Sequence, residues 1–460
     1  MINVIFNSVE FLLGFLPVFL VLYCATPAKY RNITLLVGSI LFYAFGEPVY
    51  VFLLAGSVFL NYWVGRRLVT EKTTTKKSEK KRRLLYGAMA AADVLVLCFF
   101  KWIPQTGFMA GVTGLPLGIS FYTFQILSYL TDVYRGEIPP ERSFVRLSTY
   151  IVMFPQLVAG PIVNYSEVSD DLKERRMSFE NVDQGLKLFV AGMALKVLLA
   201  DRLSLLWNQI RTVGVQSIST PYAWMGAVGY SLQLYFDFYG YSLMAVGLGR
   251  MLGFSLPENF DLPYMAKSIR EFYRRWHITL GRWFQKYVYI PMGGSRKGTL
   301  RTIFNLFVVW VLTSVWHGGG LHFLAWGMSL WFFIVLERLL DRKGLLEKSR
   351  LLSHCYVLFV IPLTWMCFAI PDFGELGIYF GRMFGFVEGI HVNPTDYVRA
   401  LQDCGPVLVA GILLCTPISG RLYGRFKDTG AGMFALAVLF WLCVDQIRQN
   451  GNNPFLYFRF

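Results

Sequence analysis

The chain has 460 residues, of which 55% are hydrophobic, 17% are aromatic and only 16% are charged. Soluble domains carry about a quarter charged residues, so this composition excludes an ordinary soluble fold and indicates a membrane protein. The net charge of +15 would suggest nucleic-acid binding in a soluble protein. In a membrane protein it indicates basic cytoplasmic loops, so we expect a lipid bilayer and no nucleic acid as partner.

Long apolar runs recur along the whole chain. Only helices and closed barrels can span lipid, and the run 9–25 lacks the alternation of barrel strands. At roughly 20 residues per span, there is room for about ten crossings. The sequence therefore predicts an all-α polytopic membrane protein. The run 9–25 has no basic stretch before it, so we expect a retained helix and not a cleaved signal. The other runs are 33–46, 48–65, 84–103, 115–131, 147–163, 185–207, 222–249, 302–316, 322–340, 352–371, 405–419 and 432–446.

The basic residues are concentrated in two blocks. Segment 66–83 holds nine Lys or Arg against two Glu, and segment 250–301 holds ten against three acidic residues. The positive-inside rule places both blocks in the cytoplasm. Counting crossings from there, we expect the N-terminus and the C-terminus to lie outside.

Two segments depart from a simple spanning pattern. Pro155 and Pro161 interrupt the run 147–163, which should therefore re-enter the membrane or lie buried against other helices. Segment 268–290 mixes basic and aromatic residues at helical spacing, with Arg270 and Arg274 on one stripe. This pattern predicts one interfacial helix, with His277 in its middle.

Five histidines are the candidates for acid–base chemistry, since imidazole titrates near neutral pH. His317 follows an apolar run and precedes three glycines, which permit close backbone approach; it could equally be a loop histidine at a helix end. His277 could equally be an amphipathic interfacial histidine. His322 lies five residues after His317, but no HExxH or CxxC spacing supplies further ligands, so we expect no metal site. The seven cysteines are interpreted as small core residues.

Asp237 is an ionisable residue within an apolar run, which makes it a functional candidate. It could orient a histidine, accept a hydrogen bond from a hydroxyl, or pair with a buried cation. Asp93 and Lys196 also lie in apolar runs, and their roles are open. The chain has no GxSxG motif and no P-loop, so a serine hydrolase or an ATP-driven pump finds no support.

Several stretches together resemble a known family. They are LGISFYTFQ (117–125), FPQLVAGPI (154–162), YSLQLYFDFYGYS (230–242), NFDLPY (259–264), REFYRRWHITLGRWFQKYVYIPMGGSR (270–296), SVWHGGG (314–320) and NPFLYFRF (453–460). The chain resembles the membrane-bound O-acyltransferases, in the branch of alginate and peptidoglycan O-acetylation. The resemblance implies a single domain over 1–460, with a signature region at about 230–320. It also implies about 11–13 transmembrane or re-entrant helices around a central tunnel.

The resemblance also implies the site residues. His317 matches the catalytic histidine of the family, and His277 matches its second characteristic polar position. Leu243 stands where many relatives have an acidic residue, so no role is carried to it. We expect further side chains to line the tunnel or its donor side: Arg274, Arg275, Trp276, Arg282, Trp283, Trp316, Asp237, Tyr239 and Gln125.

These observations predict an O-acyltransferase of a bacterial cytoplasmic membrane that transfers acetyl. We expect no bound cofactor and a cytosolic donor, acetyl-CoA or another acyl thioester, held by Arg274, Arg275 and Arg282. His317 would deprotonate the hydroxyl, and His277 would help to position the donor. The acceptor would be an extracytoplasmic polysaccharide or a serine-hydrolase-like (SGNH-type) partner acetyltransferase.

Other functions fit parts of the same pattern. The acyl group could pass to a lipid, a teichoic acid or a protein. A transporter of polysaccharides or lipid-linked sugars would explain the helices and the basic loops, but not the paired histidines. A non-catalytic scaffold for an extracellular transferase is a further alternative.

Overall fold

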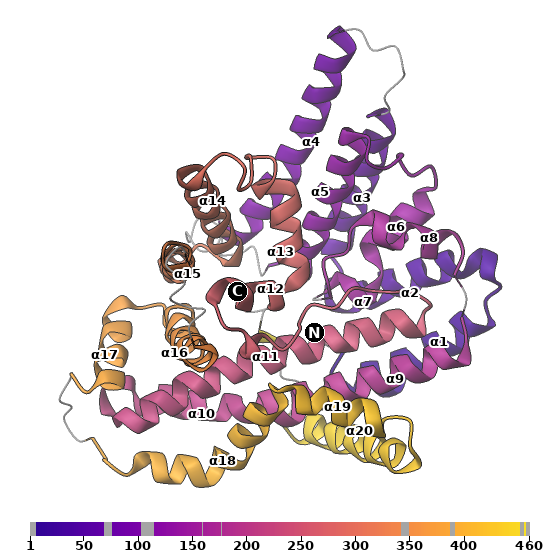
Figure 1. Cartoon of the computed structure of the whole chain (residues 1–460). Helices are drawn as coiled ribbons and strands as arrows, with labels where there is room; N and C mark the ends of the chain where they lie inside the picture. The colour runs from indigo at the N-terminus through magenta and orange to yellow at the C-terminus, as the bar shows by residue number, and fades with distance from the viewer. Residues whose placement is uncertain are drawn as a thin grey trace. The chain divides into compact units, whose positions relative to one another are not determined.

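The computed structural model describes residues 6–68, 76–102, 115–158, 160–175, 177–341, 349–386, 392–450 and 455–456. Within these ranges every regular element is a helix, and one isolated antiparallel bridge joins Phe260 and Trp276 (Figure 1). The prediction of an all-α fold is confirmed.

The helices run from α1 to α20, with short 3₁₀ or π segments between some of them. Their bounds are α1 Leu16–Ala25, α2 Arg31–Gly46, α3 Tyr50–Arg67, α4 Lys76–Trp102, α5 Ile119–Arg135, α6 Phe144–Val152, α7 Phe154–Leu157, α8 Tyr165–Lys173, α9 Phe179–Ala194, α10 Asp201–Val213, α11 Thr220–Met251, α12 Ile269–Arg275, α13 Ile278–Phe284, α14 Thr299–His317, α15 Leu321–Asp341, α16 Arg350–Ala369, α17 Phe373–Phe384, α18 Asp396–Leu414, α19 Pro417–Phe426 and α20 Gly430–Asn450.

The chain forms two compact units. The first comprises Met1–Phe189, Tyr241–Glu258 and Ile447–Pro454, and the second comprises Val190–Gly240, Asn259–Gln446 and Phe455–Phe460. The organisation as a single domain stays a prediction.

Among the described residues, six helices are long and apolar enough to cross a membrane: α4, α14, α15, α16, α18 and α20. They expose large apolar side chains such as Leu95, Phe332 and Leu413, which suits contact with lipid. Shorter apolar segments such as Glu10–Ala25 accompany them. The chain is therefore a polytopic membrane protein. The expected count of 11–13 helices around a tunnel stays a prediction.

In the first unit, α4 extends past its neighbours α3 and α5 (Figure 1). Its 27 residues correspond to about 40 Å, which exceeds the roughly 30 Å of a hydrocarbon core. Its first eight residues, KKSEKKRR, form a basic end that is almost wholly exposed. Further along the same helix, buried Asp93 accepts a hydrogen bond from Asn61 of α3 at 3.0 Å. A polar contact of this kind joins helices within lipid.

The proline-containing run 147–163 is broken and buried, as expected. Helix α6 ends at Val152, Met153 is extended, and the short α7 begins at Phe154 with Pro155 in its first turn. Extended Met153 keeps its backbone N–H bonded to the Thr149 carbonyl. The described side chains of this stretch, 147–158 and 160–163, are buried, so the irregular backbone at Met153 is covered by protein.

In the second unit, α14 packs against α15, and α15 packs against α16 (Figure 1). The prediction of one helix over 268–290 is wrong. Ser268 caps α12, which ends at Arg275, and a new helix, α13, begins at Ile278. The interruption arises because the backbone around Trp276 pairs with residues 259–261 instead of continuing the helix. His277 therefore lies at a helix break and not in the middle of a helix.

Candidate active site

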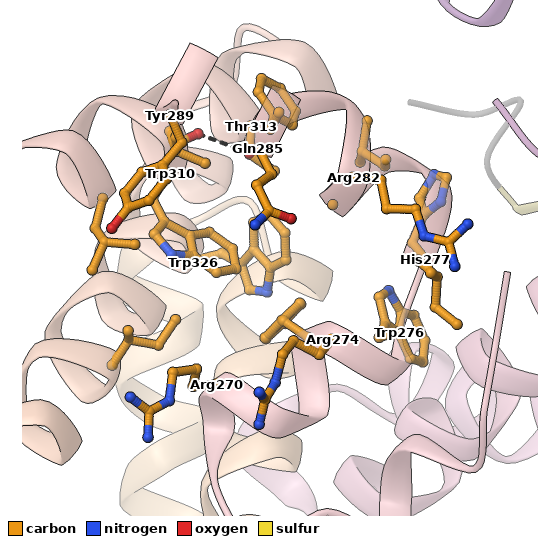
Figure 2. A pocket seen from close by; sticks show the side chains of 18 of the residues that line it. Arg270, Arg274, Trp276, His277, Arg282, Gln285, Tyr289, Trp310, Thr313 and Trp326 are labelled. Carbon is orange, nitrogen blue, oxygen red and sulfur yellow. Dashed lines mark hydrogen bonds between the residues drawn. The ribbon is translucent and has the colours of Figure 1, made fainter. Parts of the chain in front are cut away.

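A cavity of about 720 Å³ lies in the second unit. Both candidate histidines, His277 and His317, line it, and Figure 2 shows His277 at one side of the cavity. Aromatic rings from α12, the residue that follows it, α14, α15 and α16 form much of its wall: Tyr273, Trp276, Trp310, Trp326, Trp365 and Phe368.

His317 is the last residue of α14, and its side chain is 5% exposed. Its ring meets Trp326 and Phe368 edge-on, with centroids 4.9 and 5.2 Å apart. The glycine that follows is needed for space, because a Cβ on Gly318 would lie 2.6 Å from the Phe323 ring. The helix end, the missing Cβ and the aromatic wall together fix the position of the imidazole.

His277 has a backbone conformation that is unusual for a residue with a side chain. Its φ of 45° and ψ of 55° are left-handed, which costs on the order of 1–3 kcal/mol unless the surroundings compensate. Two backbone hydrogen bonds hold the segment: Asp261 N–H to the Arg275 carbonyl at 3.0 Å, and Ile278 N–H to the Asn259 carbonyl at 2.9 Å.

The imidazole of His277 is 3% exposed and meets Phe238 edge-on at 4.7 Å. Burial lowers the pKa of His277 to about 3, because removal from water penalises the charged form. The residue is therefore a neutral imidazole at physiological pH.

Four arginines give the cavity a positive charge: Arg270, Arg274, Arg282 and Arg338. None of its described lining residues is an Asp or Glu. Arg270 and Arg274 are four residues apart on α12 and share one face; Figure 2 shows them together, with Arg282 on the side of His277. The start of α12 is anchored by buried Glu337, whose carboxylate accepts the backbone N–H groups of Ile269 and Arg270.

Comparison with known proteins identifies the family. The sequence model of MBOAT, the membrane-bound O-acyltransferase family, matches residues 49–373. This chain belongs to that family. It is 36% identical to the probable alginate O-acetylase of Azotobacter vinelandii, over 99% of this chain and 100% of the relative. It is 33% identical to the peptidoglycan O-acetyltransferase of Helicobacter pylori, over 99% and 97%. A teichoic acid D-alanyltransferase of Bacillus subtilis is 28% identical over 46% of this chain and 56% of the relative. The resemblance seen in the sequence is confirmed, and the chain is an acyltransferase.

Five of the eleven site residues predicted from the sequence line the cavity of the acyltransferase. They are His277, His317, Arg274, Trp276 and Arg282. A sixth, Trp316, is not among the lining residues, but its ring centroid lies 6.3 Å from that of His277 and 4.7 Å from that of His317. It therefore contributes to the support of both imidazoles.

The structure does not bring Arg275 and Trp283 into the cavity lining. Arg275 donates to the Glu271 carboxylate at 2.9 and 3.0 Å, and it reaches the Asp261 carboxylate at 3.3 Å. Trp283 packs against Phe284 and Tyr287. Both side chains stabilise the segment that carries the cavity arginines.

Asp237 is not among the lining residues either. Its carboxylate lies 2.8 Å from the Lys196 ammonium, which also contacts Asp201 at 2.6 Å. Asp237 also accepts the backbone N–H of Leu456 at 2.8 Å. Of the three roles considered for Asp237, the geometry supports the pairing with a buried cation. Its ion pair holds together helices α10 and α11 and the described C-terminal residues.

The two remaining predicted residues also lie elsewhere. The Tyr239 ring stacks on Tyr235, with centroids 5.4 Å apart. Gln125 is buried in α5 of the first unit.

Several lining residues had no role in the sequence-based prediction of the site. Arg270 could have been added because it precedes Arg274 by one helical turn. Arg338 could have been noticed as a cation near the end of the apolar run of α15. Trp310, Trp326 and Trp365 give no such signal, because a tryptophan in an apolar helix is equally suited to lipid contact and to a cavity wall.

Proposed function

We propose that this acyltransferase transfers acetyl from a phosphate-bearing cytosolic thioester to a hydroxyl on the outer side of a bacterial cytoplasmic membrane. The observation that carries the proposal is one cavity whose described lining residues include two histidines and four arginines but no Asp or Glu. The relatives named for O-acetylation of alginate and of peptidoglycan support acetyl as the group transferred.

Acetyl-CoA is the proposed donor. Its phosphates would bind the guanidinium groups of Arg270, Arg274 and Arg338, since arginine pairs with phosphate through two parallel hydrogen bonds. The aromatic wall would enclose the pantetheine arm and exclude water.

His317 supplies the base in the proposed reaction. The hydroxyl oxygen attacks the thioester carbonyl, its proton passes to the imidazole of His317, and the C–O bond forms. The C–S bond then breaks, and the thiolate recovers the proton from His317. Positioning and base catalysis can provide much of the rate, because the thioester is already reactive.

The proposed acceptor is a cell-envelope polysaccharide, or a separate SGNH-type acetyltransferase that passes the acetyl group onward. The basic end of α4 supports a cytoplasmic position for that end. The excess of basic residues in segment 250–301, which carries α12 and its cavity arginines, likewise supports a cytosolic donor side.

A deletion strain complemented with His317→Ala tests the proposal. Ester groups on envelope polymers should be lost, while expression, membrane insertion and polymer export remain normal. His354→Ala is the matched control, because His354 is not among the described lining residues and its Nδ1 lies 3.1 Å from the Ala266 carbonyl oxygen. Normal ester content with inserted His317→Ala protein would contradict the proposal, and loss of export would favour a transporter.

A further inference from the structure

The side chain of Asn259 lies against the helix break at His277. It is 2% exposed. Its Oδ1 accepts the backbone N–H of Thr279 at 3.3 Å and the Thr279 hydroxyl at 2.7 Å. A backbone N–H can only donate, so this contact fixes which end of the amide faces His277. That end is the oxygen, an acceptor.

The same oxygen lies 3.2 Å from Nδ1 of His277. Since Oδ1 can only accept, Nδ1 must carry the hydrogen. The buried imidazole is neutral, so it has a single N–H. Its other nitrogen, Nε2, therefore carries a lone pair. A histidine in this state can accept a hydrogen bond through Nε2 but cannot donate one there to a phosphate or to a carbonyl oxygen.

We propose that Asn259 is a positioning residue that holds His277 in this tautomer, so that Nε2 accepts an amide N–H of the pantetheine arm of the donor. The inference rests on the proposed thioester donor. A pantetheine arm carries amide N–H groups close to its sulfur, whereas the thioester carbonyl and the phosphates offer only acceptors to Nε2. The hydrogen bond would set the depth at which the thioester enters the cavity. It would thereby place the thioester carbonyl where the hydroxyl that His317 deprotonates can attack it.

This role explains the strained backbone at His277. The left-handed conformation turns the imidazole so that Nδ1 meets Asn259 while the residue lines the cavity. A weakly basic imidazole suits the role, because the proposed hydrogen bond needs an acceptor and involves no proton transfer.

A pair of small donors tests the inference. S-acetyl-N-acetylcysteamine has the amide N–H two methylene groups from the thioester sulfur, as the pantetheine arm does, and its ester analogue has oxygen in place of that N–H. The purified enzyme should use the amide compound roughly 10- to 100-fold better in kcat/KM, since an unsatisfied buried acceptor costs about 1–3 kcal/mol. The difference should lie mainly in KM.

Four variants decide whether His277 and Asn259 cause this preference. His277→Ala and Asn259→Leu should use both compounds equally well. Asn259→Asp retains an acceptor for the Nδ1 hydrogen and should keep the preference. Thr279→Val is the matched control, because it removes a hydrogen bond to Asn259 but leaves the contact with His277, and it should also keep the preference.

Two results would overturn the inference. One is that folded His277→Ala or Asn259→Leu protein still prefers the amide compound over the ester compound. The other is that the wild type uses the two compounds equally well. If Asn259→Leu fails to fold, the tautomer can be read in the wild type by ¹⁵N NMR of labelled histidine, with His277→Gln to assign the signal. A hydrogen on Nε2 of His277 would contradict the inference. Failure of the proposed function is distinguishable, because it would show as transfer that survives His317→Ala.

Discussion

At the scale of single residues, the neighbours Arg274 and Arg275 have different surroundings. Arg274 lines the cavity, whereas Arg275 is paired with Glu271 and Asp261. The reason is geometric, because successive residues of a helix point about 100° apart. The basic face of α12 therefore divides into a part that can bind a donor and a part that stabilises the segment.

This division predicts different kinetics for two adjacent substitutions. Arg274→Ala should raise the KM for acetyl-CoA roughly 10- to 100-fold, because a hydrogen bond to a charged group contributes about 1.5–3 kcal/mol. Arg275→Ala should leave this KM within about twofold and cost less than ~1 kcal/mol of stability, since its ion pairs are partly exposed. Steady-state transfer over a range of acetyl-CoA concentrations measures both. Equal KM values for the two variants would show that Arg274 does not contact the donor.

At the scale of elements, the position of His317 depends on how closely α14 and α15 approach. Gly327 of α15 faces Ser314 and Trp310 of α14. A Cβ at Gly327 would overlap the Ser314 hydroxyl and lie 3.1 Å from the Trp310 carbonyl oxygen. Ser314 lies one helical turn before His317 and Trp310 about two turns before it, so the packing of the two helices holds the base in position.

Gly327→Ala should therefore separate α14 from α15 and displace His317. We expect a loss of about 1–3 kcal/mol, as for other overpacked contacts, together with a lower transfer rate. Gly377→Ala is the control, since a Cβ there meets nothing within 4 Å and the substitution should stabilise α17 slightly. Thermal unfolding in detergent and acyl transfer should be measured together. Unchanged stability and activity in Gly327→Ala would mean that the helices can adjust without moving His317.

At the scale of the whole molecule, the orientation in the membrane is the main prediction. Single cysteines near Lys77 and Lys297 should be protected from an impermeant thiol reagent in intact cells and should react after permeabilisation. A cysteine near Asn452, which lies outside the described residues, should react in intact cells. The seven native cysteines must first be replaced. Labelling at Lys77 in intact cells would reverse the orientation and the side assigned to the donor.

The sequence by itself determined that the protein is an all-α membrane protein. It also determined those helices whose apolar pattern is contained within one continuous segment. Runs of apolar residues predicted α14, α15 and α16 with small errors at their ends, because a helix that crosses the hydrocarbon core needs a continuous apolar run of about 20 residues. The apolar run 302–316 ends one residue before His317, which is the last residue of α14, and the quoted motifs correctly indicated the family.

Only the tertiary structure decided how the site is built. Residues 268–290 have the periodicity of one helix, yet hydrogen bonds to residues 259–261 interrupt it at His277. Asp237 looked like a site residue until the fold placed Lys196 2.8 Å away. In both cases the hydrogen-bonding or ionic partner is distant in sequence. The periodicity of a segment predicts which of its faces is buried, but not which polar group a side chain on that face contacts. The tautomer of His277 is the clearest example, since it depends on an amide oxygen 18 residues earlier in the chain.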